Sequence, residues 1–332
     1  IRAKPDASVL RYEVPLPANT TLPTGRGNTV AISPDGRFVA FAALSANGSQ
    51  RIYLRAADEL LPREVPGSER GTFPFFSPDG KSLGFWAGGQ YLRAPLSGGA
   101  PVVIADAPTA SAVTWTPSGW IIGSSTAIGG GLVKAPATGG APVQFTRSDT
   151  ANGEITQQNT VALPDGETVL YTSLGRGGAP TARIGVASLS DGASTILALD
   201  GMFPLGVLDG YLVYTTAAGT VMAAPYDVGA RRVTGTAIAL VDQSAVNSAN
   251  SATFAQMSLD GSLVYVRSVT RRQLTIVAPD GTSRLVGEPG PISWPRFSPD
   301  GKRIALSVGS LTQRDVWVYD LAAASSTRLT LG

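Results

Sequence analysis

The chain of 332 residues contains no histidine and no cysteine. Without these side chains it cannot build a Ser-His-Asp or Cys-His catalytic unit, an imidazole or thiolate zinc site, or a disulfide framework. A large part of known enzyme chemistry is thereby excluded. We therefore expect no catalytic residues, no metal site and no cofactor, and we predict that the protein is not an enzyme.

Charged side chains are also few, at 15% of the residues. The 26 lysines and arginines nearly balance the 24 aspartates and glutamates, and the formal net charge is only +2. The basic residues are scattered along the sequence, whereas nucleic-acid-binding proteins usually concentrate them on one face. We therefore expect no nucleic-acid partner.

Long apolar runs are missing as well. No stretch approaches the roughly 18 to 20 consecutive apolar residues of a membrane-spanning helix, so we predict no transmembrane segment in these residues. The sequence begins at Ile1 and not at methionine, which we interpret as the mark of a processed or trimmed product.

What the sequence does contain is a repeat. The tetrapeptide Ser-Pro-Asp-Gly, or a variant of it, recurs every roughly 40 to 50 residues along the chain, a period that is typical of repeat folds. Three copies are identical, and the others read TPSG, LPDG, VLDG and SLDG. The copies are Ser33–Gly36, Ser77–Gly80, Thr116–Gly119, Leu163–Gly166, Val207–Gly210, Ser258–Gly261 and Ser298–Gly301.

Each copy has the chemistry of a tight hairpin turn. Serine accepts a backbone hydrogen bond at the first position, proline fixes φ at the second, aspartate tolerates the third, and glycine supplies a positive φ at the end. Because the aspartate recurs at an equivalent position, we assign it a structural and not a catalytic role. The structural turn residues are Asp35, Gly36, Asp79, Gly80, Asp165, Gly166, Asp260, Gly261, Asp300 and Gly301.

Sequences typical of strands flank every turn, such as RFVAFAAL after the first and KRIALSV after the last. A third strand-like segment follows in most units, and a fourth comes after a further glycine-containing turn. Four antiparallel strands per unit, repeated without helices, predict an all-β fold. We expect residues 1–332 to form a single β-propeller domain of four-stranded antiparallel blades, whose faces pack against their neighbours around a ring.

Seven turns predict seven blades, with six as the alternative. Residues 1–25 precede the first complete unit, and we expect them to form an N-terminal arm, whose segment 11–17 (RYEVPLP) could close the ring beside the last blade. In the alternative, the degenerate stretch 242–254 is absorbed into a six-bladed ring.

The most regular unit reads WPRFSPDGKRIALS at Trp294–Ser307, followed by DVWVYDL and RLT. This pattern resembles the bacterial TolB-like, WD40-related propeller repeat. The order of segments from YEVPLP through AISPDGRFVAF, PFFSPDGKSLGFWAGG and APLSGGAPV to DVWVYDL is similar to the extracytoplasmic propeller of bacterial membrane-anchored Ser/Thr protein kinases. The resemblance implies a periplasmic sensor or scaffold, and it does not transfer kinase activity, because the kinase Gly-rich loop, HRD and DFG motifs are missing.

Aromatic and arginine side chains give the best candidate for a binding surface. Several of them are expected in loops at the face where blades connect, and such side chains anchor many protein interfaces. The candidate partner-contact patch consists of Arg70, Phe73, Arg176, Trp294 and Arg314. The competing site is a carboxylate cluster of Glu69, Glu154 and Glu288, which are also expected between blades.

Three functions follow from these residues. The first is a non-enzymatic protein-interaction module, either a scaffold or a sensor, on the periplasmic side of a bacterial membrane, with envelope or membrane proteins as partners and possible docking on a membrane complex. The second is a small-molecule or peptide-binding sensor domain of a receptor kinase that uses the central channel. The third is a carboxylate-dependent hydrolase or lyase, which needs two inward-facing acids close together.

Overall fold

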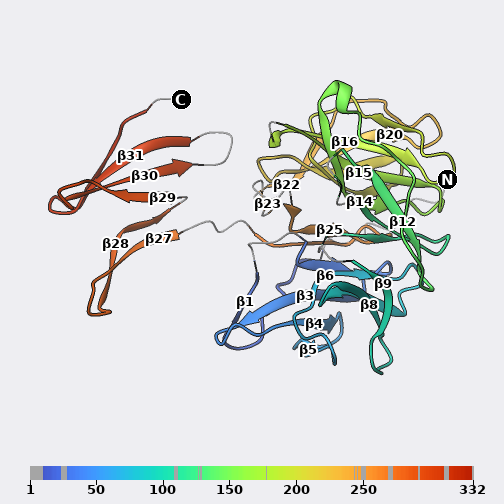
Figure 1. Ribbon diagram of the computed structural model, residues 1–332, viewed down its shortest axis with the longest axis horizontal. Helices are drawn as coiled ribbons and strands as arrows, with labels where there is room; N and C mark the ends of the chain where they lie inside the picture. Colours follow the sequence, from blue (N-terminus) through green and yellow to red (C-terminus); the bar gives the residue numbers. More distant parts are fainter. Residues whose placement is uncertain are drawn as a thin grey trace.

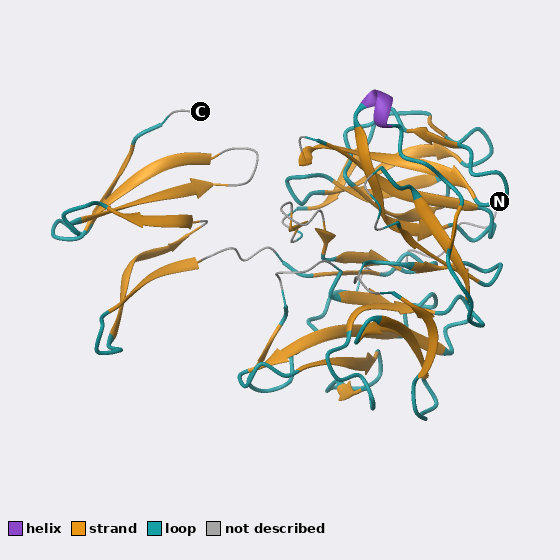
Figure 2. Cartoon of the chain, viewed as in Figure 1, coloured by secondary structure: helices purple, strands orange, loops and turns teal. Residues whose placement is uncertain are grey.

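The computed structural model describes residues 10–23, 28–107, 111–125, 127, 129–176, 178–242, 244, 246–247, 252–267, 272–290, 292–309 and 314–330. These residues form antiparallel β-sheets, with one short 3-10 helix at Thr150–Asn152 (Figure 2). The predicted all-β fold is confirmed, and so is its construction from four-stranded antiparallel blades.

Five blades follow one another from the N-terminus. In blades 2, 3 and 4 the four strands pair in sequence order, whereas blades 1 and 5 each have a fifth strand that departs from this order. Blade 1 contains β1 (Thr20–Thr21), β2 (Val30–Ile32), β3 (Phe38–Ser45), β4 (Gln50–Ala56) and β5 (Arg63–Glu64); blade 2 contains β6 (Thr72–Phe76), β7 (Ser82–Ala87), β8 (Gln90–Pro95) and β9 (Val102–Asp106). Blade 3 contains β10 (Thr114–Trp115), β11 (Trp120–Ser124), β12 (Leu132–Pro136) and β13 (Val143–Gln144). Blade 4 contains β14 (Glu154–Ala162), β15 (Thr168–Gly175), β16 (Gly178–Ser188) and β17 (Ser194–Ile196). Blade 5 contains β18 (Phe203–Leu208), β19 (Tyr211–Thr215), β20 (Val221–Asp227), β21 (Arg232–Val233) and β22 (Ile238–Val241).

The sixth unit is divided between two places. After the short pair β23 (Val246–Asn247) and β24 (Ala252–Thr253), the strands β25 (Ala255–Met257) and β26 (Leu263–Tyr265) form a two-stranded sheet, which we call the closing hairpin. The closing hairpin packs between β18 of blade 5 and β2 of blade 1, and it thereby closes the ring. The next hairpin, β27 (Arg272–Val277) with β28 (Ser283–Gly290), forms a separate two-stranded sheet.

The seventh unit is a complete four-stranded sheet: β29 (Ile292–Phe297), β30 (Arg303–Gly309), β31 (Arg314–Asp320) and β32 (Ser325–Arg328). Together with β27 and β28 it forms what we call the C-terminal arm, which lies to one side of the ring (Figure 1). Six units therefore contribute to the ring, while the seventh predicted unit folds as a blade outside it.

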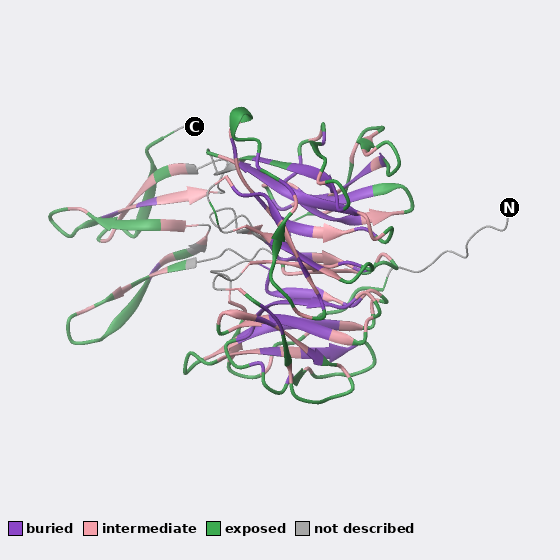
Figure 3. Cartoon of the chain, turned by 45° about the vertical axis from the view of Figure 1, so that its right-hand side comes forward, coloured by how far each residue is buried: buried purple, intermediate pink, exposed green. Residues whose placement is uncertain are grey.

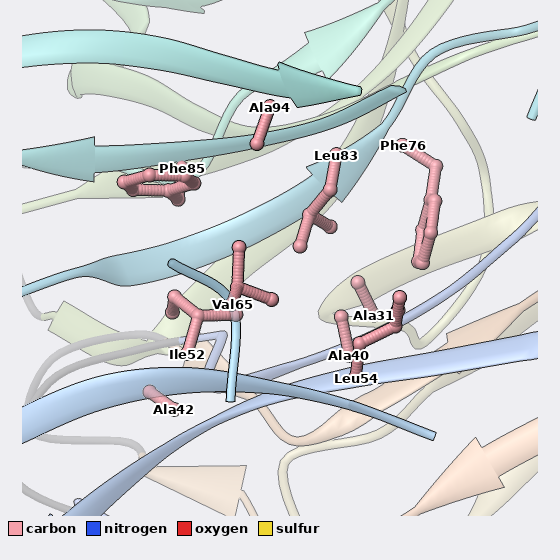
Figure 4. Close-up of a cluster of buried hydrophobic side chains, with 10 residues drawn as sticks. All are labelled: Ala31, Ala40, Ala42, Ile52, Leu54, Val65, Phe76, Leu83, Phe85 and Ala94. Atoms are coloured by element: carbon pink, nitrogen blue, oxygen red, sulfur yellow. The ribbon is translucent and has the colours of Figure 1, made fainter. Parts of the chain in front are cut away.

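The hydrophobic core lies between neighbouring blades, as the radial design requires. Between blades 1 and 2, for example, Ile52 and Leu54 pack against Leu83, Phe85 and Phe76 (Figure 4). Figure 3 shows the difference between the two parts of the chain: buried residues fill the blades of the ring, whereas the C-terminal arm is mostly exposed or half-buried.

The N-terminal arm does not close the ring as expected. Residues 11–17 form no strand, whereas β1 pairs with β3 of blade 1. Pro15 and Pro17 lack the amide hydrogens that a sheet ladder needs, which explains why this segment does not add a strand. Instead Val14 and Leu22 pack beside Val264 of the closing hairpin, so the arm covers the seam between blade 1 and the sixth unit. No helix among the described residues is long and apolar enough to cross a membrane.

Candidate functional site

Six of the seven repeated turns take the structure that their sequence predicts, with the glycine N–H donating to the carbonyl of the first turn residue, and each turn connects the innermost strand of its unit to the next. The fifth turn differs, because Leu208 pairs directly with Tyr211 and Asp209 also has a positive φ of +48°. In blade 2, Ser77 Oγ donates a hydrogen bond of 2.6 Å to Asp79 Oδ1, which also accepts from Lys81 N at 3.0 Å. Ser82 N in turn donates to Ser77 Oγ at 2.9 Å, and Gly80 has a φ of +66°. The same pattern links Ser33 with Asp35, Ser258 with Asp260, and Ser298 with Asp300.

These hydrogen bonds stabilise the ionised aspartates. The Ser77 hydroxyl and then the Lys81 amide lower the pKa of Asp79. Burial raises the pKa of Asp35, but the hydrogen bonds from Ser33 and the Arg37 amide outweigh it and lower the pKa overall. A carboxylate that is held ionised by its own turn is suited to structure and not to proton transfer, which agrees with the structural assignment.

The turns meet at a central cavity of about 150 Å³, which is lined by the innermost strand of each of the six units in the ring. Prolines of four turns line it, and every described residue of its wall is uncharged. The Oδ1 atom of Asn28 lies buried at this wall without a hydrogen-bond partner among the described residues. The four prolines are Pro34, Pro78, Pro117 and Pro164.

The three candidate carboxylates lie on different elements and have separate partners. Glu69 pairs with Arg51, and Glu154 is buried, where it accepts hydrogen bonds from Asp149 N at 2.7 Å and Gln157 Nε2 at 3.0 Å. Glu288 is exposed on β28 in the C-terminal arm, not in a loop between blades. No group of three or more acidic side chains in the described part of the chain could hold a metal ion.

The candidate partner-contact patch is not one surface. Arg70 and Arg176 are exposed on blades 2 and 4 at the ring, whereas Trp294 belongs to the C-terminal arm. The prediction for Phe73 is wrong, because its side chain is only 7% exposed and lines the central cavity. Arg314 begins β31, where its backbone pairs with Gly309; its side chain lies outside the described residues.

Trp294 and Phe73 are nevertheless equivalent residues of two units. Each lies four residues before the serine of its turn and directly before a proline, in TFPFFSPDG and SWPRFSPDG. Each has a positive φ, +52° for Phe73 and +50° for Trp294, at a β-bulge in the innermost strand. The two positions differ in exposure, since Trp294 is 68% exposed.

A second pair of equivalent aromatic residues, three positions further along each strand, differs in exposure in the same way. Phe76 in blade 2 is 8% exposed, whereas its equivalent Phe297 in the seventh unit is 58% exposed. Phe76 is covered by Ala31 and Ala40, which belong to the inner half of the preceding blade. The inner half of the unit that precedes Phe297 is the closing hairpin, which lies in the ring. We call Trp294 and Phe297 the aromatic patch; aligning the repeats would have identified both residues, but only the fold reveals their exposure.

No family model matches the chain, and no curated protein matches it. Solved structures do resemble it at low identity. TolB from Acinetobacter baumannii is 15% identical with a TM-score of 0.41, covering 88% of this chain and 75% of that one. The Cps50 (Swd1) β-propeller domain from Myceliophteria thermophila is 12% identical with a TM-score of 0.42, covering 92% and 87%. Oligogalacturonate lyase from Vibrio parahaemolyticus is 12% identical with a TM-score of 0.42, covering 92% and 77%. The chain is thus similar in structure to β-propeller proteins.

Proposed function

We propose that the chain is a non-enzymatic protein-binding propeller whose contact surface is the aromatic patch of the C-terminal arm. The observation that carries this proposal is the exposure of Trp294 and Phe297, at 68% and 58%, where their equivalents Phe73 and Phe76 are 7% and 8% exposed. Large exposed aromatic side chains are the residues that dominate binding energy at protein interfaces.

The surroundings of the patch suit a protein partner. An apolar hollow lies beside Trp294 and is lined by Leu274, Ile292, Pro295 and Leu306. Arg296 is exposed between the two aromatic residues in sequence, and arginine is enriched at interfaces together with tryptophan. A partner side chain that entered the hollow would be desolvated on several sides, which is the arrangement of an interface hot spot.

The finer assignment concerns location and partner class. We propose that the module acts on the periplasmic side of a bacterial membrane, as the sensor region of a membrane-anchored Ser/Thr kinase or as a scaffold on an envelope complex. The order of repeat segments supports this assignment. Protease treatment of spheroplasts that carry the intact source protein tests it: cleavage of the propeller from outside is expected, and full protection would contradict it.

A second candidate function uses the central cavity. Its uncharged wall and the buried Asn28 Oδ1 without a partner favour a small neutral ligand that donates one hydrogen bond, because an unpaired buried acceptor is costly. The carboxylate-enzyme alternative has less support, since Glu69, Glu154 and Glu288 are engaged or exposed on separate elements.

The binding proposal is tested by photo-crosslinking to envelope extracts of the source cells. The bait is the purified chain, compared with the double variant Trp294→Ser/Phe297→Ser and with Val316→Ser, which changes another exposed apolar residue of the same unit. We expect the double variant to lose about tenfold or more of a specific partner, while Val316→Ser retains it. Equal capture by all three proteins would refute the aromatic patch as the contact surface.

A further inference from the structure

The closing hairpin has two apolar faces, and each has its own neighbour in the ring. One face packs on blade 5 and the other on blade 1. Val264 and Val266 form the second face, where they meet Val30, Val39 and Phe41 of blade 1. The residues of the first face are Ala255, Met257, Leu263 and Tyr265.

The hairpin also has an edge, along β26, that pairs with no further strand among the described residues; just beyond it Arg267 forms an isolated bridge with Ser244. In every other unit the second strand pairs with the third, as β7 does with β8 and β30 with β31. In the described residues, however, β26 pairs only with β25, and β27 pairs only with β28. The connection 266–271 between them is of ordinary length for this chain, since β19 and β20 are joined by 216–220, and β11 and β12 by 125–131.

The outer half of the sixth unit already covers the seventh. Val286 of β28 and Ile304 and Leu306 of β30 are buried in the C-terminal arm, and the ring of Tyr319 lies against Gly287. What this interface lacks is the inner half of the sixth unit. In the ring, the inner half of blade 1 covers Phe76 of blade 2. Phe297 is the equivalent of Phe76, and it is exposed where the closing hairpin would cover it if the sixth unit were assembled in the same way.

The face of blade 1 that the hairpin covers has a counterpart at the same repeat positions of the seventh unit, where Ile304 and Leu306 are already buried in the C-terminal arm and Phe297 is exposed. Counted from the serine of each turn, the residue before it and those six and eight after it form this face in both units. All of them are apolar, so the two faces offer the hairpin a similar surface. The residues are Ile32, Val39 and Phe41 in blade 1 and Phe297, Ile304 and Leu306 in the seventh unit.

We propose that the closing hairpin exchanges between these two faces of its own chain. In the observed state it closes a ring of six units and leaves the aromatic patch exposed. In the alternative state β26 pairs with β27, the sixth unit becomes one four-stranded blade, Val264 and Val266 turn to Phe297, and the seventh unit enters the ring. The contact with blade 5 is kept in both states. The alternative state covers the aromatic patch, so the exchange would control partner binding; that role rests on the proposed function.

Several contacts hold the hairpin on blade 1 in the observed state. Leu259 N donates to Pro34 O at 2.9 Å, which joins the turns of the two units. From the N-terminal arm, Glu13 forms an ion pair of 2.6 Å with Arg267, just beyond the hairpin. The N-terminal arm therefore favours the six-unit ring, although not in the way that the sequence predicts.

Distances between spin labels distinguish the two states. Because the chain has no cysteine, Lys81→Cys and Lys302→Cys give unique labels at equivalent exposed positions after the turns of blade 2 and the seventh unit. The turns of all six ring units contribute residues to the wall of the central cavity. We therefore expect a long distance for the observed state and a second, shorter distance for the seven-unit ring.

Two substitutions shift the populations in known directions. Phe297→Ser removes a contact of the alternative state and is expected to abolish the short distance. Glu13→Arg breaks the exposed ion pair with Arg267 that belongs to the observed state, and it is expected to enrich the short distance about two- to fivefold. The charge swap Glu13→Arg/Arg267→Glu is expected to reverse that enrichment.

A single long distance that none of these variants changes would overturn the proposal. A short distance that disappears on dilution would also overturn it, because the occupant would then be a second copy of the chain. The experiment is independent of partner capture. Two distances without any captured partner would support the exchange and refute the proposed function. A captured partner with one fixed distance would support the proposed function and refute the exchange.

Discussion

Phe75 and Gly84 are register partners on β6 and β7 of blade 2, and the phenyl ring occupies the space of a missing side chain. A Cβ atom on Gly84 would lie 2.2 Å from Phe75 Cζ. Blade 4 repeats the arrangement on its next pair of strands, where a Cβ on Gly185 would lie 2.2 Å from Cζ of Tyr171. The large aromatic residues of these blades thus depend on a glycine across the sheet.

Gly84→Ala is therefore expected to destabilise the fold by about 1–3 kcal/mol, because the added methyl group must displace a ring that is packed on all sides. Urea unfolding followed by tryptophan fluorescence measures the change. The matched control is Gly290→Ala, where the nearest atom to an added Cβ lies 3.8 Å away and little change is expected. If Gly84→Ala were as stable as the parent chain, Phe75 would have another place to pack.

A second prediction concerns the turn hydroxyl. Ser77→Ala removes both the donor to Asp79 and the acceptor for Ser82 N, and it should cost about 1 kcal/mol, as is typical for a net hydrogen bond in a protein. The exposed Ser49→Ala is the control and should be neutral. In a double-mutant cycle with Asp79→Ala, the two changes should be less than additive; full additivity would show that Ser77 and Asp79 act separately.

The turns could be predicted because their chemistry is local. Serine, proline, aspartate and glycine determine the hairpin within a few residues, and Ser77 Oγ accepts the backbone hydrogen bond, from Ser82 N, that the sequence predicts. The hydrogen bonds that Asp79 accepts from Ser77 Oγ and Lys81 N were not predicted. The placement of the closing hairpin could not be predicted, since blade 1 and the seventh unit offer it apolar faces at the same repeat positions. For the same reason Phe73 and Trp294 have matching sequence and backbone but opposite exposure.

Lys134 connects blades 3 and 4, and this gives a third prediction. Its Nζ donates to Leu189 O at 2.8 Å and lies 5.2 Å from the ring centroid of Trp120 and 5.4 Å from that of Phe145. Lys134→Met keeps the length of the side chain but removes the charge, and it should destabilise the fold by about 1–2 kcal/mol. The exposed Arg232→Met should have little effect. A neutral result for Lys134→Met would mean that packing alone joins these blades.

The fourth prediction is a plateau of stability from about pH 5 to pH 8, since the chain has no histidine to titrate there. Below it, stability should fall. The hydrogen bonds of the turns lower the folded-state pKa of Asp79 and Asp300, so their contribution is present above the unfolded value of about 3.9 and is lost as the pH falls through the folded value. Thermal unfolding between pH 2 and 8 measures this, and Asp79→Asn should flatten the acid limb. A midpoint that fell between pH 5 and 8 would contradict the prediction.

The fifth prediction is that folding stability falls again above about pH 10, this time as the pH rises. Burial raises the pKa of Tyr171 to about 12, with a further increase from nearby Glu154, and burial likewise raises the pKa of Tyr226 to about 12. Because the folded-state values lie above the unfolded value of about 10, both tyrosines stabilise the fold fully below pH 10 and lose that contribution between about pH 10 and 12. Tyr226→Phe should therefore keep the fold stable to a higher pH. Unfolding curves at alkaline pH, collected together with phenolate absorbance, measure this. The exposed Tyr211→Phe should not, and phenolate formation by every tyrosine at about pH 10 before unfolding would refute the assignment.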